Sequence, residues 1–515
     1  KFAASEAVFG SSTIHPIPDI DNTDFLLIFG ANPRVSHMSF ISIADPMASL
    51  RAASKRGADI RFVDPRYNES IKGIGTHVSV KPDTDVYLMA AILHHLFDKG
   101  MVNHEYIQDH ADHIEGLRSF VSEYSPEQVA SVVGISAQSI AALGDDIGAA
   151  KSAAFYMSTG VNMGRQGSLA YWLLFMLSVV TGNLDKPGGN VYSRGFYPAA
   201  KSGRIQGDVK YEPTPLGDVR KIRGSLPGNL MADMILSEDN PIKGLIVISG
   251  NPILSMGSGE KLQRALEQLE FVMVIDIYPS ATSEYADYLL PATDMFERAD
   301  INICGLGMQK EPFIQYTNFI VPPKAERRPE WWILRQIELA QGFATENREL
   351  DDYQGAIDEL GLFSRFDHML RQSNLSINDV KSSGTVVLDS VAPGKFFSNV
   401  IQTESSRVDC MPASFDEAIG RCREIFDELG REPGNQLKMI SRRTNYMINS
   451  WFHNVPSLKR PKHQNNPLYV HPDDARARNL GEGSTVTVKN EFGEIRTVVA
   501  LDESLKTGTV AITHG

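Results

Sequence analysis

The first stretch that could carry chemistry places glycine, asparagine and acidic side chains at the ends of two apolar runs. The run 25–29 ends in Gly30-Ala31-Asn32-Pro33, and the next apolar run closes on Asp64, with Ser70 six residues later. A short apolar run that ends in glycine and leads into a helix is typical of a buried parallel strand in a βαβ unit. Glycine lets a ligand approach the backbone, the helix N-terminus attracts phosphate, and the aspartate can accept hydrogen bonds from a ribose or a base. This stretch therefore predicts a nucleotide site.

The same parts return in the same order further along the chain. The run 245–248 ends in Ser249-Gly250-Asn251-Pro252, the next run closes on Asp276, and Thr282 again follows six residues later. A P-x-T-D sequence, which ends at Asp85 in the first stretch, completes both. This repeated order indicates an internal duplication. Neither copy contains G-x-G-x-x-G, so the match to an ordinary dinucleotide-binding fold is partial, and two plain βαβ units with turn residues at their strand ends are the alternative.

A glycine-rich loop between a strand and an apolar helix is the third candidate. The predicted strand 153–157 is followed by the loop 158–167, which has three glycines, and then by an apolar helix over 168–180. Backbone N–H groups in such a loop can hold a phosphate or a pterin, and Arg165 could supply positive charge. The alternative is a tight strand-to-helix turn with a surface arginine.

The elements that must position these residues belong to the α/β class. Periodicity predicts helices over 47–56 and 85–99, a capped helix that starts at Ser125-Pro126-Glu127-Gln128, and a strand over 60–63. After residue 437 the pattern changes to short strands separated by turns, which predicts a small β domain. We expect two related doubly wound α/β domains with mostly parallel sheets, followed by a C-terminal β-barrel-like domain.

Three segments have no clear period. Residues 1–24 are expected to be a lead-in, in which 16–21 form the loop before the first strand. Residues 193–240 are expected to be a long loop or crossover, and residues 343–435 are mixed and polar. The predicted divisions of the chain are 1–230 for the first α/β domain, 231–345 for the second, 346–435 for a mixed connecting region and 436–515 for the incomplete β domain.

Bulk composition argues against several classes of protein. At 515 residues the chain is long enough for roughly three or four domains. Its formal charge of −13 argues against nucleic acid as a partner, because nucleic acid would need a basic face. No apolar run reaches the roughly 18 residues of a membrane span, which argues against direct membrane insertion. Cys304, Cys410 and Cys422 are too widely separated for a disulfide framework or a C-x-x-C metal site.

Together these motifs give the chain a resemblance to a known enzyme family. It resembles the molybdopterin oxidoreductases of the dimethyl sulfoxide reductase superfamily, which bind molybdenum or tungsten through two pterin guanine dinucleotides. The resemblance covers nearly the whole chain and is weakest over 343–435. The motifs that carry it are Gly30-Ala31-Asn32-Pro33, Val63-Asp64-Pro65-Arg66, Pro82-Asp83-Thr84-Asp85, Thr181-Gly182-Asn183, Pro187-Gly188-Gly189, Ser249-Gly250-Asn251-Pro252, Tyr285-Ala286-Asp287, Leu290-Pro291-Ala292-Thr293, Ser441-Arg442-Arg443 and Asn449-Ser450-Trp451 with His453-Asn454.

The resemblance implies that each α/β half holds one guanine dinucleotide. The residues expected at the first dinucleotide are Gly30, Asn32, Asp64, Arg66 and Asp85. Those expected at the second are Gly250, Asn251, Pro252, Asp276, Thr282 and Asp287. Those expected near the pterins or pyrophosphates are Gly160, Asn162, Gly164, Arg165 and Arg443. The carboxylates would accept hydrogen bonds and Arg66 would hold a phosphate, while Asp85, Asp287 and Arg443 have alternative roles as helix caps or ion pairs.

Part of the family pattern is absent from this sequence. In the family, the iron–sulfur cysteines and the residue that ligates the metal lie upstream of the Gly-x-Asn-Pro strand, where this chain has none of its three cysteines. We therefore assign no metal ligand and no catalytic residue. The resemblance implies a molybdenum or tungsten bis-molybdopterin guanine dinucleotide, and a [4Fe-4S] cluster held by upstream residues. It also implies a small-molecule substrate and an iron–sulfur or membrane-anchor electron-transfer subunit, in a cytoplasmic protein whose possible export the N-terminal sequence leaves open.

The predicted activity is a two-electron oxidation or reduction of a small molecule at the metal. Formate dehydrogenase-like and oxyanion- or sulfoxide-reductase-like members of the family both fit the motifs. The alternative from another class is a cofactor-free structural subunit of a respiratory electron-transfer complex with the same fold. The two acidic strand ends, the glycine-rich loop and Arg443 speak against that alternative, because a scaffold does not need them. A plain α/β nucleotide-binding protein does not explain the C-terminal β domain.

Overall fold

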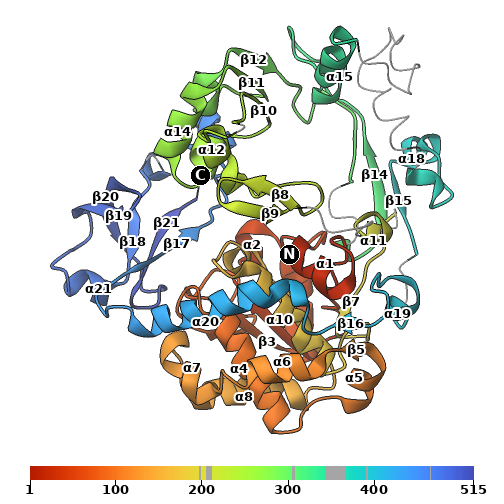
Figure 1. Cartoon of the computed structure of the whole chain (residues 1–515), viewed down its shortest axis with the longest axis vertical. Coiled ribbons are helices and arrows are strands. Elements are labelled where there is room, and N and C mark those ends of the chain that lie inside the picture. The colour runs from red at the N-terminus through yellow and green to blue at the C-terminus, as the bar shows by residue number, and fades with distance from the viewer. Residues whose placement is uncertain are drawn as a thin grey trace.

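The computed structural model describes most of the chain, and Figure 1 shows how its parts are arranged. Cys304 and the first part of the predicted connecting region lie outside the described residues. The chain forms a first α/β unit, a second α/β unit, and a C-terminal β domain. The described residues are 1–196, 199–204, 211–239, 241–303, 308–342, 367, 369–389, 393–463 and 465–514.

The first unit is built on a four-stranded parallel sheet in the order β4-β3-β2-β6. Its central strand β2 is fully buried and apolar, which is the pattern expected for a parallel strand covered on both faces. The predicted strand over 153–157 is confirmed as β6. The strands are β2 (Phe25–Phe29), β3 (Asp59–Val63), β4 (Thr76–Val78) and β6 (Ala153–Met157).

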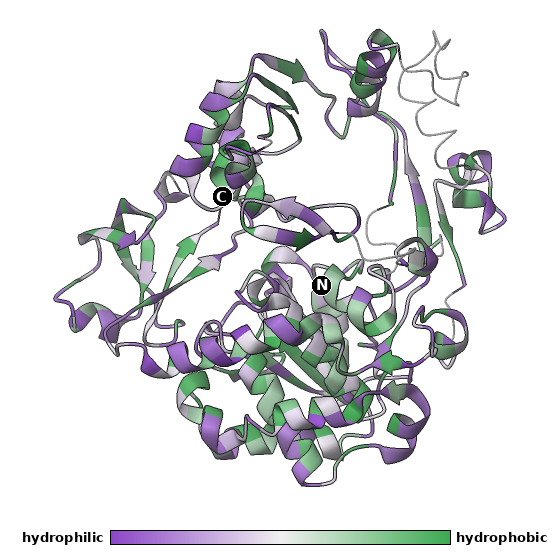
Figure 2. Cartoon of the chain, viewed as in Figure 1, coloured by the Kyte–Doolittle hydropathy of each residue, from purple (hydrophilic) through white to green (hydrophobic). Residues whose placement is uncertain are grey.

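Helices cover both faces of this sheet and bury the largest core of the molecule. Helix α10 (Gly167–Val180) is buried along nearly its whole length and packs against α4 and β6. Figure 2 shows hydrophobic residues gathered on these central elements, with hydrophilic residues on the outer helices. The other helices of the unit are α1 (Phe2–Phe9), α2 (Pro33–Ser36), α3 (Pro46–Arg56), α4 (Asp85–Asp98), α5 (His104–His110), α6 (Ile114–Val121), α7 (Pro126–Val133), α8 (Ala137–Ala149) and α9 (Thr159–Asn162).

The predicted helix signals are confirmed where the local chemistry is strong. Helix α7 begins with a complete capping box, in which Ser125 and Gln128 bond each other's backbone N–H groups. Helix α3 begins at an Asp45 cap and ends at a left-handed Gly57. Across the described part of the chain, none of the helices combines the length and apolar character of a membrane span.

Two helices lie in segments where the sequence analysis assigned no helix. The lead-in over 1–24 contains helix α1, whose Val8 and Phe9 are fully buried against α10. The polar region before residue 435 contains helix α20 (Asp416–Arg431), which packs its apolar side, including Ile419, Cys422 and Ile425, into the core of the first unit. Both helices depend on long-range packing, which local patterns do not reveal.

The segment over 193–240, predicted as a long loop, also carries regular structure. It contains a β-hairpin of β8 (Tyr211–Thr214) and β9 (Gly217–Arg220), followed by α12 (Met231–Ile235). Arg220 of the hairpin pairs with Glu6 of α1, so this segment is tied to the first unit. In Figure 1 the hairpin lies between the two α/β units.

The second unit repeats the first sheet on a smaller scale. Its three strands are parallel and follow the order β10-β11-β12. Helices α12 and α14 pack together on an apolar cluster beside this sheet. The elements are β10 (Gly244–Ile248), α13 (Pro252–Ser255), α14 (Gly259–Gln268), β11 (Phe271–Asp276), η2 (Thr282–Tyr285), β12 (Tyr288–Pro291) and α15 (Glu330–Ala340).

The C-terminal residues form the predicted β domain as a five-stranded mixed sheet in the order β17-β21-β18-β20-β19. A smaller antiparallel sheet, β13-β14-β15, carries the chain between the second unit and α20. The strands are β13 (Asp300–Ile301), β14 (Phe313–Thr317), β15 (Thr385–Val387), β17 (Lys438–Arg442), β18 (Leu468–Val470), β19 (Thr485–Asn490), β20 (Gly493–Leu501) and β21 (Thr509–Thr513).

The buried α10 core predicts a large difference between two identical substitutions. Leu173→Ala removes a side chain that is fully buried in α10 and should lower the free energy of unfolding by about 2–5 kcal/mol. Leu216→Ala, at a hairpin turn where the leucine is 67% exposed, should change it by less than about 0.5 kcal/mol. Denaturant unfolding followed by circular dichroism compares the two, and equal losses of stability would contradict the described core.

Candidate functional site

The carboxyl ends of all four strands in the first sheet meet at one edge. Strand β2 connects through α3 to β3 on one side, whereas β6 pairs with β2 on the other, so the chain reverses its direction of winding between β2 and β6. In open α/β sheets, ligands bind in the crevice beside such a switch point. Gly30 follows β2 and Gly160 follows β6, so the first sequence-predicted glycines lie at this crevice.

Gly30 and Gly160 make the closest backbone approach at this edge. The Gly160 N–H donates to the Gly30 carbonyl at 3.1 Å. A Cβ added to Gly160 would lie 2.7 Å from that carbonyl oxygen, and Gly30 adopts a left-handed backbone with φ +54°. Both positions therefore require glycine, and the loop after β6 can approach the loop after β2 only because both side chains are absent.

Asn32 is held at this edge by the hydroxyl that the sequence places after Asp64. The Ser70 Oγ donates to Asn32 Oδ1 at 2.6 Å and accepts from the Arg34 backbone N–H at 2.9 Å. Asn32 precedes the short helix α2 with φ −125° and ψ 76°.

The second unit repeats this arrangement atom by atom. Thr282 Oγ1 donates to Asn251 Oδ1 at 2.8 Å and accepts from the Ile253 backbone N–H at 3.3 Å. Asn251 precedes α13 with φ −129° and ψ 72°, nearly the angles of Asn32. Pro252 is the first residue of α13 and is buried. The duplication predicted from the sequence is therefore also a duplication of local geometry.

The equivalent of Gly30 in the second unit is Ser249, which sequence reasoning missed. The Ser249 N–H donates to the carbonyl of Ile275, as the Gly30 N–H donates to that of Val63, and its φ is +52°. Gly250, the residue we predicted, has an ordinary backbone and nothing within 3.4 Å of an added Cβ. Its lack of a side chain is therefore not required by the fold. The sequence could have identified Ser249, because it lies two residues before Asn251, as Gly30 lies two residues before Asn32.

Two acidic side chains at the first edge have carboxyl pKa values above the usual range for aspartate. Burial among dense surrounding atoms raises the pKa of Asp64 to about 6, although part of its surface stays accessible. Burial also raises the pKa of Asp85 to about 7, and the nearby charges of Asp64 and Asp83 add to that effect. Asp64 accepts hydrogen bonds from the Arg66 N–H at 2.8 Å and from Asn68 Nδ2 at 3.0 Å. The structure thus brings Asp64 and Asp85 together.

Arg66, which the sequence predicts to hold a phosphate, forms an ion pair in this structure. Both terminal nitrogens bond the Glu69 carboxylate, at 3.2 and 2.8 Å. Glu69 also accepts from Asn32 Nδ2 at 2.6 Å and lies 3.8 Å from Arg442 of the C-terminal domain. The sequence did not show this partner, because Glu69 belongs to the turn between the two predicted motifs. Arg66 therefore ties the turn after β3 to Glu69 in this structure, and its role toward a phosphate stays a prediction.

Arg165 is also paired with carboxylates, which matches its alternative reading as a surface arginine. It bonds Asp83 at 2.7 Å and Glu428 of α20 at 2.9 Å. Gly164 lies beside the same Asp83, and Asn162 ends the short helix α9. The glycine-rich loop therefore stays at the first edge, but its arginine is neutralised.

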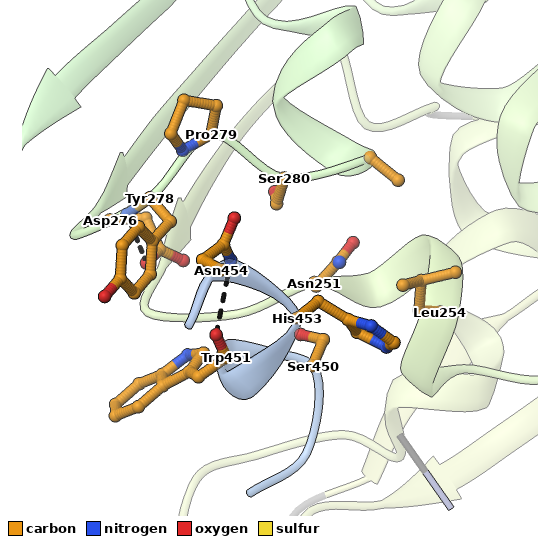
Figure 3. A pocket seen from close by; sticks show the side chains of 11 residues that line it. Asn251, Leu254, Asp276, Tyr278, Pro279, Ser280, Ser450, Trp451, His453 and Asn454 are labelled. Carbon is orange, nitrogen blue, oxygen red and sulfur yellow. Dashed lines mark hydrogen bonds between the residues drawn. The ribbon is translucent and has the colours of Figure 1, made fainter. Parts of the chain in front are cut away.

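The second edge opens into a cavity of about 200 Å³ that two distant parts of the chain share. Asn251, Asp276 and Tyr278 line it from the second unit, and Trp451 and Asn454 line it from the segment η5 (Trp451–Asn454). Figure 3 shows these side chains facing one another from the two segments. The remaining lining residues are Leu254, Pro279, Ser280, Ala281, Ser450 and His453.

Asp276 and Trp451 give this cavity the groups that a purine nucleotide needs. Asp276 Oδ1 accepts from the Ile277 backbone N–H at 2.6 Å, and burial raises the pKa of its carboxyl group. An aromatic ring such as Trp451 offers a flat apolar surface on which a base can stack. Sequence reasoning missed Trp451 and Tyr278 as site residues, although the family motif that contains Trp451 was visible.

Asp287 lies at the wrong end of its sheet for the predicted role. It precedes β12 and its carboxylate accepts from the Val272 backbone N–H at 2.8 Å, near the start of β11. Asp276 ends β11, so the two aspartates occupy opposite edges of a parallel pair of strands. Asp287 therefore links the start of β12 to the start of β11 and does not lie beside Asp276.

Arg443 is the predicted cation that keeps its charge available. Its guanidinium bonds the neutral Asn449 side chain at 3.2 Å, and no carboxylate lies within 4.0 Å among the residues that the structure describes. Burial lowers the pKa of Arg443, and burial together with the positive charge of Arg443 lowers the pKa of His514. A half-buried guanidinium without an acidic partner suits an anionic ligand such as a pyrophosphate.

Comparison with known proteins identifies this arrangement. The family model described as Molybdopterin oxidoreductase matches residues 3–339, and the model described as Molydopterin dinucleotide binding domain matches residues 437–515. The chain belongs to the molybdopterin oxidoreductase family. Family membership makes it a molybdopterin-dependent oxidoreductase and supports a molybdopterin dinucleotide as its cofactor.

The relatives of this molybdopterin oxidoreductase are distant. An F420-dependent formate dehydrogenase subunit alpha of Methanocaldococcus jannaschii is 24% identical over 98% of this chain and 74% of its own length. A nitrate reductase of Synechocystis is 26% identical over 65% of this chain and 48% of its own length. The solved structure of acetylene hydratase from Pelobacter acetylenicus superposes with a TM-score of 0.79 at 17% identity, over 100% of this chain and 73% of that protein. This last likeness establishes the fold.

The residues present fit a dinucleotide cofactor. The loops after β2 and β6 meet at the crevice beside the switch point, Asp64 and Asp276 offer oxygen acceptors at the two strand ends, and Arg443 has no carboxylate partner among the described residues. Among the described residues no group of three or more metal-binding side chains occurs.

The acidic pair at the first edge predicts a specific pH dependence in cofactor-free protein. Because folding raises the carboxyl pKa values of Asp64 and Asp85, the folded state holds more protons, and this contribution to stability is lost as pH rises through about 6 to 7. Asp85→Asn should therefore be more stable than the wild type at pH 8, with a difference that shrinks at pH 5. Thermal unfolding at both pH values measures it, with the exposed Asp98→Asn as the control. A constant difference across this range would contradict the assignment.

Proposed function

We propose that the protein holds molybdenum or tungsten through two pterin guanine dinucleotides, one in each α/β half. The observation that carries this proposal is the repeated Asn–hydroxyl geometry at two carboxyl edges, each beside an aspartate whose pKa is raised by burial. A single nucleotide would need only one such edge. Two dinucleotides bound in pseudo-symmetric positions account for both edges.

Each edge contributes a different set of groups in this proposal. At the first edge, Asp64 and Asp85 accept hydrogen bonds from the guanosine end, and the crevice beside the Gly30 and Gly160 loops holds the pyrophosphate. At the second edge, the base occupies the cavity beside Asp276 and stacks on Trp451. Arg443, which directly follows β17, is the cation for a pyrophosphate.

The bound metal supplies the redox chemistry, and the protein residues position the cofactor and exclude water. We propose formate as the first substrate to test, because the relative that aligns over 98% of the chain is a formate dehydrogenase subunit. In that reaction formate gives carbon dioxide, one proton and two electrons. We also propose a [4Fe-4S] cluster bound by residues outside this sequence, a cytoplasmic location, and an iron–sulfur or membrane-anchor subunit as the electron acceptor.

The alternative is a cofactor-free structural subunit of a respiratory electron-transfer complex. One observation favours it, because Arg66 and Arg165 are both neutralised by carboxylates of the chain itself. Arg443 and the cavity at Asp276 favour the enzyme, since neither is closed by other described parts of the chain.

The test is turnover by the complete protein, expressed in a host that makes the cofactor. We expect formate to reduce an oxidised viologen dye, with molybdenum or tungsten present in the purified protein. Nitrate with reduced viologen is the second assay, because a nitrate reductase is also a relative. Protein that carries the metal but turns over neither compound would overturn the proposed substrate class. Protein without metal or pterin would favour the structural subunit.

A further inference from the structure

A buried cluster beside the glycine-rich loop belongs to neither of the two predicted guanosine sites. It contains Lys1 and His15, which are 9% and 3% exposed, together with the rings of Phe40, Tyr156 and Tyr171. The cluster lies where β6 ends, because Lys1 Nζ donates to the carbonyl of the last β6 residue at 2.7 Å. The loop that carries Gly160 begins one residue later.

Lys1 is a buried cation without a counter-charge in the described part of the chain. Its ammonium lies 3.9 Å from the centre of the Phe40 ring, and none of the ion pairs among the described residues includes it. Burial lowers the pKa of its side chain to about 7. A lysine left in this setting carries a large desolvation cost unless an anion approaches it.

His15 adds an unsatisfied hydrogen-bonding atom to the same cluster. Its Nδ1 meets Ser5 Oγ at 3.1 Å and Tyr171 Oη at 3.2 Å, whereas its Nε2 is buried and has no hydrogen-bond partner. Burial and the charge of Lys1 lower its pKa to about 3, with the Ser12 backbone acting weakly in the other direction, so the ring is neutral. Buried polar atoms without a partner are rare and mark places where a ligand or water completes the site.

The backbone around Phe40 adopts strained left-handed angles at two residues. Phe40 and His37 both have positive φ, at 68° and 54°, which residues other than glycine rarely adopt. The Ser39 carbonyl between them accepts a hydrogen bond from Tyr156. The segment that follows the Gly30 turn is thus folded back onto the cluster.

The order of the strands tells which end of a dinucleotide would reach this cluster. Asp85 and Asp64 follow β4 and β3, Gly30 and Gly160 follow β2 and β6, and Lys1 contacts the end of β6. Neighbouring strands are about 4.8 Å apart, so the edge from β4 to β6 extends roughly 15 Å. A dinucleotide with its base at the aspartates and its pyrophosphate at the glycines would place its pterin end at Lys1 and His15.

We propose that Lys1 and His15 bind the pterin end of the first dinucleotide, with the lysine ammonium facing its anionic sulfur-bearing part and the imidazole donating or accepting one hydrogen bond. The inference rests on the proposed function. Lys1 and His15 are positioning residues here, and no chemistry beyond binding is assigned to them.

The test measures how much pterin the complete protein retains after gel filtration. Lys1→Met should lower retention about 10-fold or more, the expected effect of losing one charged hydrogen bond, and Lys1→Arg should restore most of it. Lys186→Met is the matched control, because that exposed lysine donates to the Lys151 carbonyl near the other end of β6. The control should retain pterin as the wild type does.

A second variant covers the case in which Lys1→Met fails to fold. His15→Phe keeps an aromatic ring in the core but loses the hydrogen bonds to Ser5 and Tyr171, so its folding is checked by circular dichroism, and the folded variant should retain less pterin than the wild type. Wild-type retention in a folded Lys1→Met or in His15→Phe would overturn this inference alone. A wild-type protein that takes up no pterin would overturn the proposed function instead.

Discussion

The contact between the Gly30 and Gly160 backbones is the constraint on which the first unit depends. It joins the loops after β2 and β6 at the point where the sheet reverses its winding, and it leaves no room for a Cβ at Gly160. A side chain there would push the two loops apart and widen the crevice in which ligands of open α/β sheets bind. The buried helix α10, which follows the second loop, holds that loop against the sheet.

The two edges share a frame but differ in what they present. Asn32 with Ser70 and Asn251 with Thr282 form the same hydrogen bonds, so the frame is conserved between the halves of the molecule. At the first edge Glu69 pairs with Arg66 and Arg442. The second is open to η5 and its Trp451. The C-terminal domain therefore takes part in both sites, through Arg442 at one and Trp451 at the other.

The sequence predicted those parts of the fold that strong local signals determine. The strand at 153–157, the capping box at Ser125 and the duplicated motifs were all visible, because periodicity and capping chemistry are local. Helices α1 and α20 were missed, since they form only by packing against a distant core. For the same reason the sequence could not show that Glu69 forms an ion pair with Arg66. Nor could it show that Asp287 and Asp276 lie at opposite ends of their strands.

The most direct test of two dinucleotide sites is the number of pterin and guanosine monophosphate equivalents obtained when the complete protein from a cofactor-making host is denatured and its cofactor pyrophosphate is hydrolysed in acid. The account predicts about two of each per chain. In Asp276→Asn the number should fall towards one, because that substitution removes an acceptor at the second edge, whereas Asp287→Asn at the other end of the sheet should keep two. One pterin equivalent per chain in the wild type, or an equal loss of pterin in the two variants, would contradict the presence of two dinucleotide sites.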